Sequence, residues 1–394
     1  MLAASRRVAP LLPIQSVADA IDLPLEKYRQ ARATQPVAFD AQFNQWNVYR
    51  YADTLRVLND PAVFTSERGG AMALPSIVGM DGGRHRKLRS LVTLAFTPRM
   101  VEQLGPRITA VAEDLLEEVR RQGRFDVIQQ FAYPLPIRII AEMLGIPVED
   151  QATFHRWSET LIAGPRTDAR RGHSSAGERA QTLVELNQYL AGQIDRRRKQ
   201  PGADLISRLL AAEVDGDRLN EGDLVEFCRL LLIAGYETTA CQIGTAILAM
   251  VEMPEVAAQL RADPALLPGA VEEIVRCFPS VAATVRVALS DVELAGTAIS
   301  RGQSLILWTG SANYDESLFA DPERFDIRRS PNRHLGFGQG PHFCLGAPLA
   351  RLEVRMALGL FLQKFPNLRR EPSETLESVD SPFLLGVKHL HLAG

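Results

Sequence analysis

One segment near the C-terminal end of the sequence combines a single cysteine with closely spaced glycines. Cys344 lies in a run in which Gly338, Gly340 and Gly346 permit tight turns and a close approach of the backbone to a flat partner. Pro348 follows and suits the first turn of a helix. A helix N-terminus stabilises the thiolate of a cysteine, and the thiolate is the form that binds metal. The segment therefore predicts a metal ligand at Cys344.

The remaining ligands of such a metal would have to come from elsewhere. No second Cys or His lies at the spacing of a four-ligand zinc site. A single thiolate suits a metal whose other ligands belong to a macrocycle, as in haem iron. A lone cysteine is more often a buried structural residue, but the surrounding glycines favour the ligand interpretation of Cys344.

A second group of candidate residues lies at 234–239, within a predicted helix. Gly235 and Thr238 are weak helix formers, so helix propensity does not account for them. Gly235 would let a ligand press on the helix, and Thr238 could donate its hydroxyl proton to the carbonyl of Ala234. Glu237 is a carboxylate in an apolar stretch, which is costly unless it is solvated or paired. These residues could therefore face a ligand; a capped or surface-facing turn is the alternative.

Two pairs of charged residues lie at helical spacing elsewhere. Glu273 and Arg276 are three residues apart and His85 and Arg89 are four apart, so each pair shares one helix face. Residues that share a helix face at this spacing can pair with each other. Solvated surface contacts are the alternative for each residue.

A largely helical framework is needed to position these residues. The longest predicted helix covers 220–253, with Asn220 as its cap and Pro254 after its end. At 1.5 Å per residue it would be about 50 Å long, and its apolar centre at 230–234 predicts that it is buried. Shorter helices are predicted at 108–119 and from Pro348 to about Phe365. Strand-like segments are predicted at 46–51 and between 284 and 308, with an irregular segment at 314–337.

Composition restricts the class of protein. The 394 residues are 46% apolar and 23% charged, and 44 basic against 47 acidic residues give a formal net charge of −3. These values exclude a disordered chain and a strongly basic nucleic-acid binder. Four scattered cysteines favour a reducing compartment, and no stretch approaches the roughly 20 apolar residues of a spanning helix. We expect a single-domain cytoplasmic protein with no membrane or nucleic-acid partner.

The cysteine segment resembles the haem-binding signature of the cytochrome P450 family, F-G-x-G-x-(R/H)-x-C-x-G. All the defined positions match, namely Phe337, Gly338, Gly340, His342, Cys344 and Gly346. Residues 234–239 resemble the family's oxygen-activation motif, and Glu273 and Arg276 its E-x-x-R. The resemblance implies a mainly helical single domain over 1–394 with a small β region, of the bacterial soluble type. It places haem b between the long helix and the cysteine loop.

The same resemblance implies a role for each matched residue. Cys344 would be the axial ligand of the haem iron, and Glu237 and Thr238 would deliver protons during dioxygen activation. Haem contacts are implied for His85, Arg89, Arg286, His342, Phe337, Gly338, Gly346, Ala234 and Gly235. Arg324 is expected to join Glu273 and Arg276 in a structural triad, with Arg328 as the second choice. The helix carrying His85 has Gly82 and Gly83 where the family usually has prolines, so its start is expected to be looser.

The implied reaction is the insertion of one oxygen atom from O2 into an apolar organic substrate, by hydroxylation or epoxidation. Electrons from NAD(P)H would arrive through a ferredoxin or flavodoxin with its reductase, docking near Cys344 on a basic face of a monomeric enzyme. That face is expected to contain Arg84, Arg86, Lys87, Arg333 and Arg351. A peroxide-dependent peroxygenase and a non-catalytic haem-thiolate gas sensor or carrier are the alternatives.

Pocket-lining positions are implied for apolar residues from four parts of the chain. They are Met72, Leu74, Ile77, Val78, Met80, Ile233, Ala234, Val281, Ala282, Phe383 and Leu384. Arg166, Arg170, Arg171 and His173 lie where a lid is expected and could meet a substrate carboxylate or face water.

Overall fold

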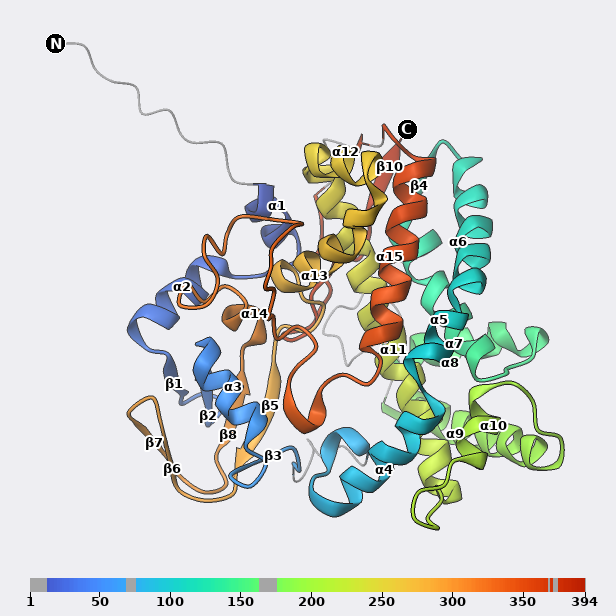
Figure 1. Ribbon diagram of the computed structural model, residues 1–394, viewed down its shortest axis with the longest axis horizontal. Coiled ribbons are helices and arrows are strands. Elements are labelled where there is room, and N and C mark those ends of the chain that lie inside the picture. The colour runs from blue at the N-terminus through green and yellow to red at the C-terminus, as the bar shows by residue number, and fades with distance from the viewer. Residues whose placement is uncertain (1–12, 69–75, 163–175, 368, 371–374, 394) are drawn as a thin grey trace.

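The computed structural model describes residues 13–68, 76–162, 176–367, 369–370 and 375–393. Its longest element is α11 (Glu221–Glu252), which runs through the middle of the molecule among the other helices (Figure 1). Asn220 accepts a hydrogen bond from the Asp223 N–H, and Asp223 returns one to the Asn220 N–H, which forms a capping box. The predicted start and end of this helix are confirmed.

Four helices pack against α11 or against each other around it. They are α6 (Gly105–Arg120), α7 (Pro134–Met143), α9 (Ala176–Lys199) and α15 (Ala347–Lys364). The predicted apolar face of α6 is buried, including Ile108, Leu115 and Val119. These contacts bury most of α11, so the long helix forms the core of the fold.

Further α-helices lie around this group in the described part of the chain. They are α1 (Pro13–Ala20), α2 (Leu25–Thr34), α3 (Tyr51–Asn59), α4 (Gly82–Ala95), α5 (Pro98–Gln103), α8 (Gln151–Ile162), α10 (Leu205–Ala211), α12 (Pro254–Ala262), α13 (Leu267–Cys277) and α14 (Thr309–Ala312). The residue before α4, Asp81, makes no side-chain cap hydrogen bond to this helix.

The strands form three small sheets beside the helices. The largest has the order β1 (Val37–Asp40), β2 (Gln45–Val48), β8 (Ser304–Leu307), β5 (Thr284–Ala288) and β3 (Phe64–Thr65). The others contain β4 (Arg124–Asp126), β10 (His391–Ala393) and β9 (Arg369–Arg370), and the hairpin β6 (Val292–Leu294) with β7 (Thr297–Ile299). The β region at 284–308 is confirmed, whereas the strand predicted at 46–51 is shorter because Tyr51 begins α3.

One large hydrophobic cluster contains buried side chains from Ile14 to Leu392. That continuity supports the single-domain expectation, which stays a prediction. Among the described residues, α11 is the one helix long and apolar enough by composition to cross a membrane. Its most apolar window is 61% buried inside the protein, as expected of a core helix.

Candidate functional site

The cysteine loop joins the irregular segment after α14 to the start of α15. Gly338 and Gly340 have φ angles of +69° and +71°, a region that favours glycine. A Cβ atom on Gly340 would lie 2.6 Å from the carbonyl oxygen of Leu58, so this glycine also permits close backbone packing. The loop is closed by the Cys344 N–H, which donates to the carbonyl of Phe337 at 2.9 Å. The loop geometry therefore fixes the position of the thiol.

The thiol of Cys344 lies in a polar but largely buried environment. Burial raises its pKa, and hydrogen bonds from the backbone of Gly346 and Ala347 and the charges of Arg351 and Arg89 oppose this effect without reversing it. The expected net lowering by the helix N-terminus is therefore wrong for the isolated side chain. A bound metal cation would supply the missing stabilisation of the thiolate.

The middle of α11 carries an open polar turn. Thr238 Oγ1 donates to the carbonyl of Ala234 at 2.7 Å, which confirms the predicted local contact. Ala234 is exposed although the helix is buried from Thr239 to Met250, so the helix is uncovered at this turn. A Cβ atom on Gly235 would meet Ile140 of α7 at 3.0 Å. Close helix packing therefore gives a reason for this glycine, and its haem contact stays a prediction.

The C-terminal turn lies against the same helix. Val281 and Leu384 form an isolated β-bridge, and the Ala282 N–H donates to the carbonyl of Phe383 at 2.8 Å. A Cβ atom on Gly386 would lie 2.8 Å from the sulfur of Cys241, one turn beyond Glu237. Burial raises the pKa of Cys241, and the nearby charge of Glu237 raises it further.

Val281, Ala282, Phe383 and Leu384 are predicted to line a pocket in this region, and the first two differ clearly in exposure. Val281 is 37% exposed and can contact a ligand, whereas Ala282 is 1% exposed and lies against Gly310. Ala282 lines no open space in this structure, so its predicted pocket role is wrong. Phe383 and Leu384 are half-buried beside the bridge, and Ile233 is half-buried on α11.

Two histidines stack next to the cysteine loop. The rings of His85 on α4 and His342 lie 4.3 Å apart, and His342 Nε2 is 2.8 Å from Asp81 Oδ1. Asp81 also accepts hydrogen bonds from the hydroxyl of Thr65 and the N–H of Ser66. Burial lowers the pKa of His85 to about 4, and its Nε2 atom is buried without a partner.

Three arginines complete what we call the basic cluster, defined as His85, His342, Arg68, Arg89 and Arg286. Arg89 Nη2 donates to the carbonyl of Phe343 at 2.6 Å, and Arg286 Nη1 donates to the Val285 carbonyl at 2.8 Å. Burial lowers the pKa of Arg286 to about 10, and the nearby charge of Arg68 lowers it further. Arg68 was not predicted; its buried, unpartnered Nε is the signal that identifies it, and sequence spacing gave none.

The basic cluster fits a group that carries two carboxylates. Besides burial, the charges of Arg89 and Arg286 lower the pKa of His342, Arg89 lowers that of His85 and Arg68 lowers that of Arg286, and Asp81 is the carboxylate that opposes these shifts. His85 and Arg68 each retain a buried nitrogen with no partner. A thiol next to such a cluster matches haem, which has one axial position for a thiolate and two propionates.

Glu273 on α13 lies at the centre of a second set of contacts. Arg276 Nε and Nη2 donate to its two carboxylate oxygens at 2.8 Å, so the predicted pair is confirmed as a contact. Arg329 Nε donates to the same carboxylate at 3.2 Å, and Asn332 Nδ2 donates at 3.0 Å. We call Glu273, Arg276, Arg329 and Asn332 the framework cluster.

The prediction that Arg324 is the third member of this cluster is wrong. Arg324 contributes only its backbone carbonyl, which accepts from Arg329 at 3.0 Å, and its side chain is exposed. The second choice, Arg328, donates instead to Gln259. The chain turns between Asp321 and Arg329, so the later arginine faces Glu273.

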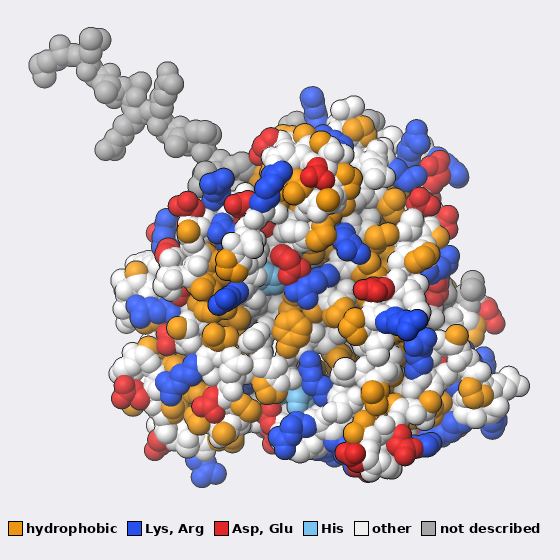
Figure 2. All heavy atoms as spheres, viewed as in Figure 1, with side chains coloured by type: hydrophobic (Ala, Val, Ile, Leu, Met, Phe, Trp, Pro, Cys, Tyr) orange, Lys and Arg blue, Asp and Glu red, His pale blue; other side chains and the backbone are white. Residues whose placement is uncertain are grey.

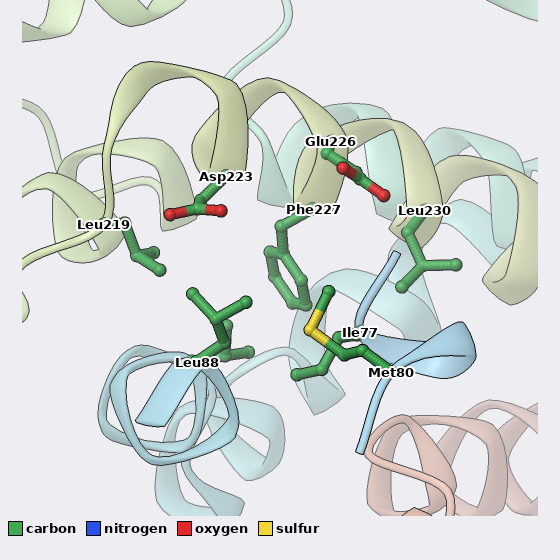
Figure 3. Close-up of a pocket in the computed structure, with 9 residues that line it drawn as sticks. Ile77, Met80, Leu88, Leu219, Asp223, Glu226, Phe227 and Leu230 are labelled. Atoms are coloured by element: carbon green, nitrogen blue, oxygen red, sulfur yellow. The ribbon is translucent and has the colours of Figure 1, made fainter. Parts of the chain in front are cut away.

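The loop before α4 meets the start of α11. Figure 3 shows Ile77 and Met80 facing Phe227 and Leu230 of α11, with Leu88 of α4 beside them. The cavity between them measures about 20 Å³, room for about one water molecule. Ile77 therefore lines a small cavity here, and Val78 is 40% exposed. Met72, Leu74, Arg166, Arg170, Arg171 and His173 lie outside the described residues.

A surface groove lies between α4 and the cysteine loop. Its lining includes Arg86, Arg89, Leu94 and Pro341, and Figure 2 shows this part of the surface as a hollow with basic side chains at its edge. The expected basic face is partly neutralised, because other members of it form ion pairs. The pairs are Arg84 with Asp223, Lys87 with Asp217, and Arg351 with Glu272.

Comparison with known proteins agrees with this geometry. The family model "Cytochrome P450" matches residues 59–389. "Cytochrome P450 109" of Bacillus spizizenii is 40% identical over 98% of this chain and 95% of that protein. "Cyclomarin C epoxidase CymV" of Salinispora arenicola is 39% identical over 93% of this chain and 94% of that protein.

Solved structures give the same result. The crystal structure of CYP109E1 from Bacillus megaterium in complex with corticosterone matches with a TM-score of 0.89 and 36% identity. The match covers 94% of this chain and 98% of that one. The roles of individual site residues remain predictions. The chain belongs to the cytochrome P450 family, and it is a bacterial haem-dependent monooxygenase with the mainly helical fold that the sequence predicts.

Proposed function

We propose that this enzyme inserts one oxygen atom into an apolar organic substrate, with Cys344 as the axial ligand of haem b. The observation that carries the proposal is the pairing of a partly buried thiol with a basic cluster in which Asp81 is the opposing carboxylate. His85, Arg89, Arg286 and His342 would hold the propionates. When bound, haem supplies dioxygen binding and O–O bond cleavage.

Arg68 is proposed as an additional propionate ligand. Its Nε is buried without a partner, and its charge disfavours the charged form of Arg286. A carboxylate between the two guanidinium groups would remove that repulsion.

Thr238 and Glu237 are proposed to move protons to the reacting oxygen. Because Thr238 Oγ1 donates its own proton to Ala234, its lone pairs can accept a hydrogen bond from a ligand above the helix. Glu237, one residue earlier and half-buried, can supply protons to this hydroxyl. This pair favours a monooxygenase over a peroxygenase, and a gas sensor has no need of it.

The thiolate assignment is tested by reducing the protein and adding carbon monoxide. We expect the strongly red-shifted Soret band of thiolate ligation, and we expect Cys344→Ser to abolish it. Cys241→Ser, at a buried cysteine outside the loop, is the control and should retain the band. An unshifted band in the parent protein would refute the proposal.

The proton role is tested by Thr238→Ala. Haem binding and substrate binding should persist while electrons are diverted to hydrogen peroxide, and Thr238→Ser should restore coupling because it keeps the hydroxyl. Equal coupling in the alanine variant would exclude this role for Thr238.

The substrate is proposed to be apolar and of medium to large size. Support comes from the aliphatic side chains at Ile233, Val281 and Leu384, and from two related structures that contain corticosterone and testosterone. A library screened for compounds that shift the haem spin state tests this proposal, and a preference for small polar compounds would refute it.

Electrons are proposed to come from NAD(P)H through a ferredoxin or flavodoxin that docks in the groove beside α4. Arg86 and the 55% exposed Leu94 offer a basic and an apolar contact there, and Arg89 joins the groove to the cysteine loop. Arg86→Glu should slow reduction by the partner and leave substrate binding unchanged. The enzyme is proposed to act as a cytoplasmic monomer.

A further inference from the structure

Glu272, the neighbour of the framework residue Glu273, has a separate set of partners. Its Oε1 accepts from Arg351 Nε at 2.6 Å, and its Oε2 accepts from Arg351 Nη2 at 2.8 Å. Oε2 also lies 3.1 Å from His334 Nε2. Residues from α13, α15 and the segment before the cysteine loop therefore meet at one carboxylate. A bidentate pair of this kind fixes the plane of the guanidinium group.

His334 is oriented by a second contact. The N–H of Gly336 donates to His334 Nδ1 at 3.2 Å, so Nδ1 is an acceptor and the proton resides on Nε2. Nε2 can then donate to Glu272. The side chain of His334 is 3% exposed, and a Cβ atom on Gly336 would lie 2.5 Å from Val275 Cγ1. This tight packing holds Glu272 in place from the side opposite to solvent.

Arg351 is held against the cysteine loop by an aromatic ring. Its Cζ atom lies 4.4 Å from the ring centroid of Phe337, a cation–π contact. The carbonyl of Phe337 accepts the N–H of Cys344 at 2.9 Å. The positive charge is thus fixed relative to the loop by Glu272 on one side and by Phe337 on the other.

The charge of Arg351 lies against the loop that carries the sulfur of Cys344. Arg351 is on α15, the helix that begins just after Cys344, and its guanidinium group covers the Phe337 ring of the same loop. Arg351 is 34% exposed and Glu272 is 30% exposed, so the pair is only partly screened by water.

We propose that Arg351 is a positioning residue that sets the electrostatic potential at the Cys344 sulfur, and that Glu272 limits this effect by partial neutralisation. The inference rests on the proposed function in that Cys344 must be the iron ligand. A fixed positive charge favours the more negative, reduced state of a haem-thiolate centre, so Arg351 raises the reduction potential and Glu272 lowers it.

The test is spectroelectrochemical titration of the haem-loaded protein and its variants. Arg351→Gln should lower the equilibrium constant for one-electron reduction by about tenfold, a shift of about 59 mV. Glu272→Gln should raise the constant, since it leaves the charge of Arg351 unopposed. Arg351→Lys should remain close to the parent. Arg355→Gln, which removes an exposed arginine one turn further along α15, is the matched control and should leave the potential unchanged.

Opposite shifts in Arg351→Gln and Glu272→Gln would support the proposal, because a general loosening of the loop would move both variants in the same direction. An unchanged potential in Arg351→Gln would overturn it. Slower reduction by a ferredoxin at an unchanged potential would also overturn it and would assign Arg351 to docking. If the parent protein lacks the red-shifted carbon monoxide band, the proposed ligand fails instead, which separates the two results.

Discussion

The framework cluster and the basic cluster both bury charge, but they balance it differently. In the framework cluster Glu273 is 0% exposed and accepts from two arginines and an asparagine. Arg276 also finds a backbone carbonyl, so each charge has partners inside the protein. In the basic cluster, Asp81 is the one acid among the causes that shift the histidines and Arg286.

This difference separates residues that hold the fold from residues that hold a ligand. A buried charge with a full set of partners stabilises one arrangement of the chain, whereas basic side chains crowded together with too few acids disfavour one another's charged forms until an anion binds. Removing a framework charge should therefore damage folding. Removing a charge from the basic cluster should damage haem retention.

The largest effect is expected for Glu273→Ala. Arg276 would remain fully buried without its carboxylate, which costs about 3–5 kcal/mol when one partner of a buried pair is removed. Urea unfolding and the yield of soluble protein would measure the loss. A variant within about 1 kcal/mol of the parent would show that the framework cluster does not hold the fold.

A smaller loss is expected for Arg329→Ala. Its guanidinium binds Glu273 and donates to the carbonyls of Ala320, Asp321 and Arg324, so its removal should cost about 2–3 kcal/mol. Arg324→Ala is the matched control, and as an exposed residue it should cost less than about 1 kcal/mol. Equal losses in urea unfolding would contradict the assignment of Arg329.

Arg286→Ala is expected to weaken haem retention while leaving the fold intact. Loss of one charge-assisted hydrogen bond corresponds to about 1.5 kcal/mol, so haem transfer to an acceptor protein should be about tenfold faster. The circular dichroism spectrum should not change, because the Arg286 side chain is not part of an ion pair with the framework cluster. Arg301→Ala, an exposed arginine near the same sheet, is the control. Unchanged haem transfer would remove Arg286 from the proposed site.

The sequence predicts these two clusters unequally, for physical reasons. The long helix and the cysteine loop are encoded locally, by the Asn220 cap and by glycines whose spacing is visible in the chain. Glu273 and Arg276 are likewise three residues apart on one helix. Arg329 could not be chosen over Arg324, because the irregular segment has no periodicity and its turns decide which arginine faces inward.

The sequence also cannot predict the environment of residues whose role depends on tertiary packing. Gly235 is explained by Ile140 of another helix, and Arg68 by its nearness to Arg286 across the fold. The direction of the pKa shift of Cys344 depends on burial, which outweighs the local effect of the helix N-terminus. Local motifs thus identify candidate side chains, and packing decides their environment.

The smallest effect on the free energy of unfolding is expected for Glu272→Gln, because the charge of Glu272 is only partly buried. Burial alone would raise its pKa, but hydrogen bonds from His334 and Arg351 lower it to about 2 from an ordinary value of 4.5. A carboxylate with a lowered pKa stabilises the fold above its unfolded-state pKa, and this stabilisation is lost as pH falls from about 4.5 toward 2. Because the side chain is 30% exposed, we expect Glu272→Gln to cost about 1 kcal/mol at pH 7.

Urea unfolding at pH 7, 5 and 3.5 would measure the difference in unfolding free energy between Glu272→Gln and the parent. The gap should be largest at pH 7 and should narrow at pH 3.5, where Glu272 binds a proton in the unfolded parent but is still ionised in the folded one. In an Arg351→Gln background the Glu272→Gln substitution should cost less, because the partner is already gone. If the difference in unfolding free energy widened on acidification, Glu272 would not be stabilised as a carboxylate by Arg351 and His334. Glu272 would then share with the framework cluster only its position next to Glu273 in the sequence.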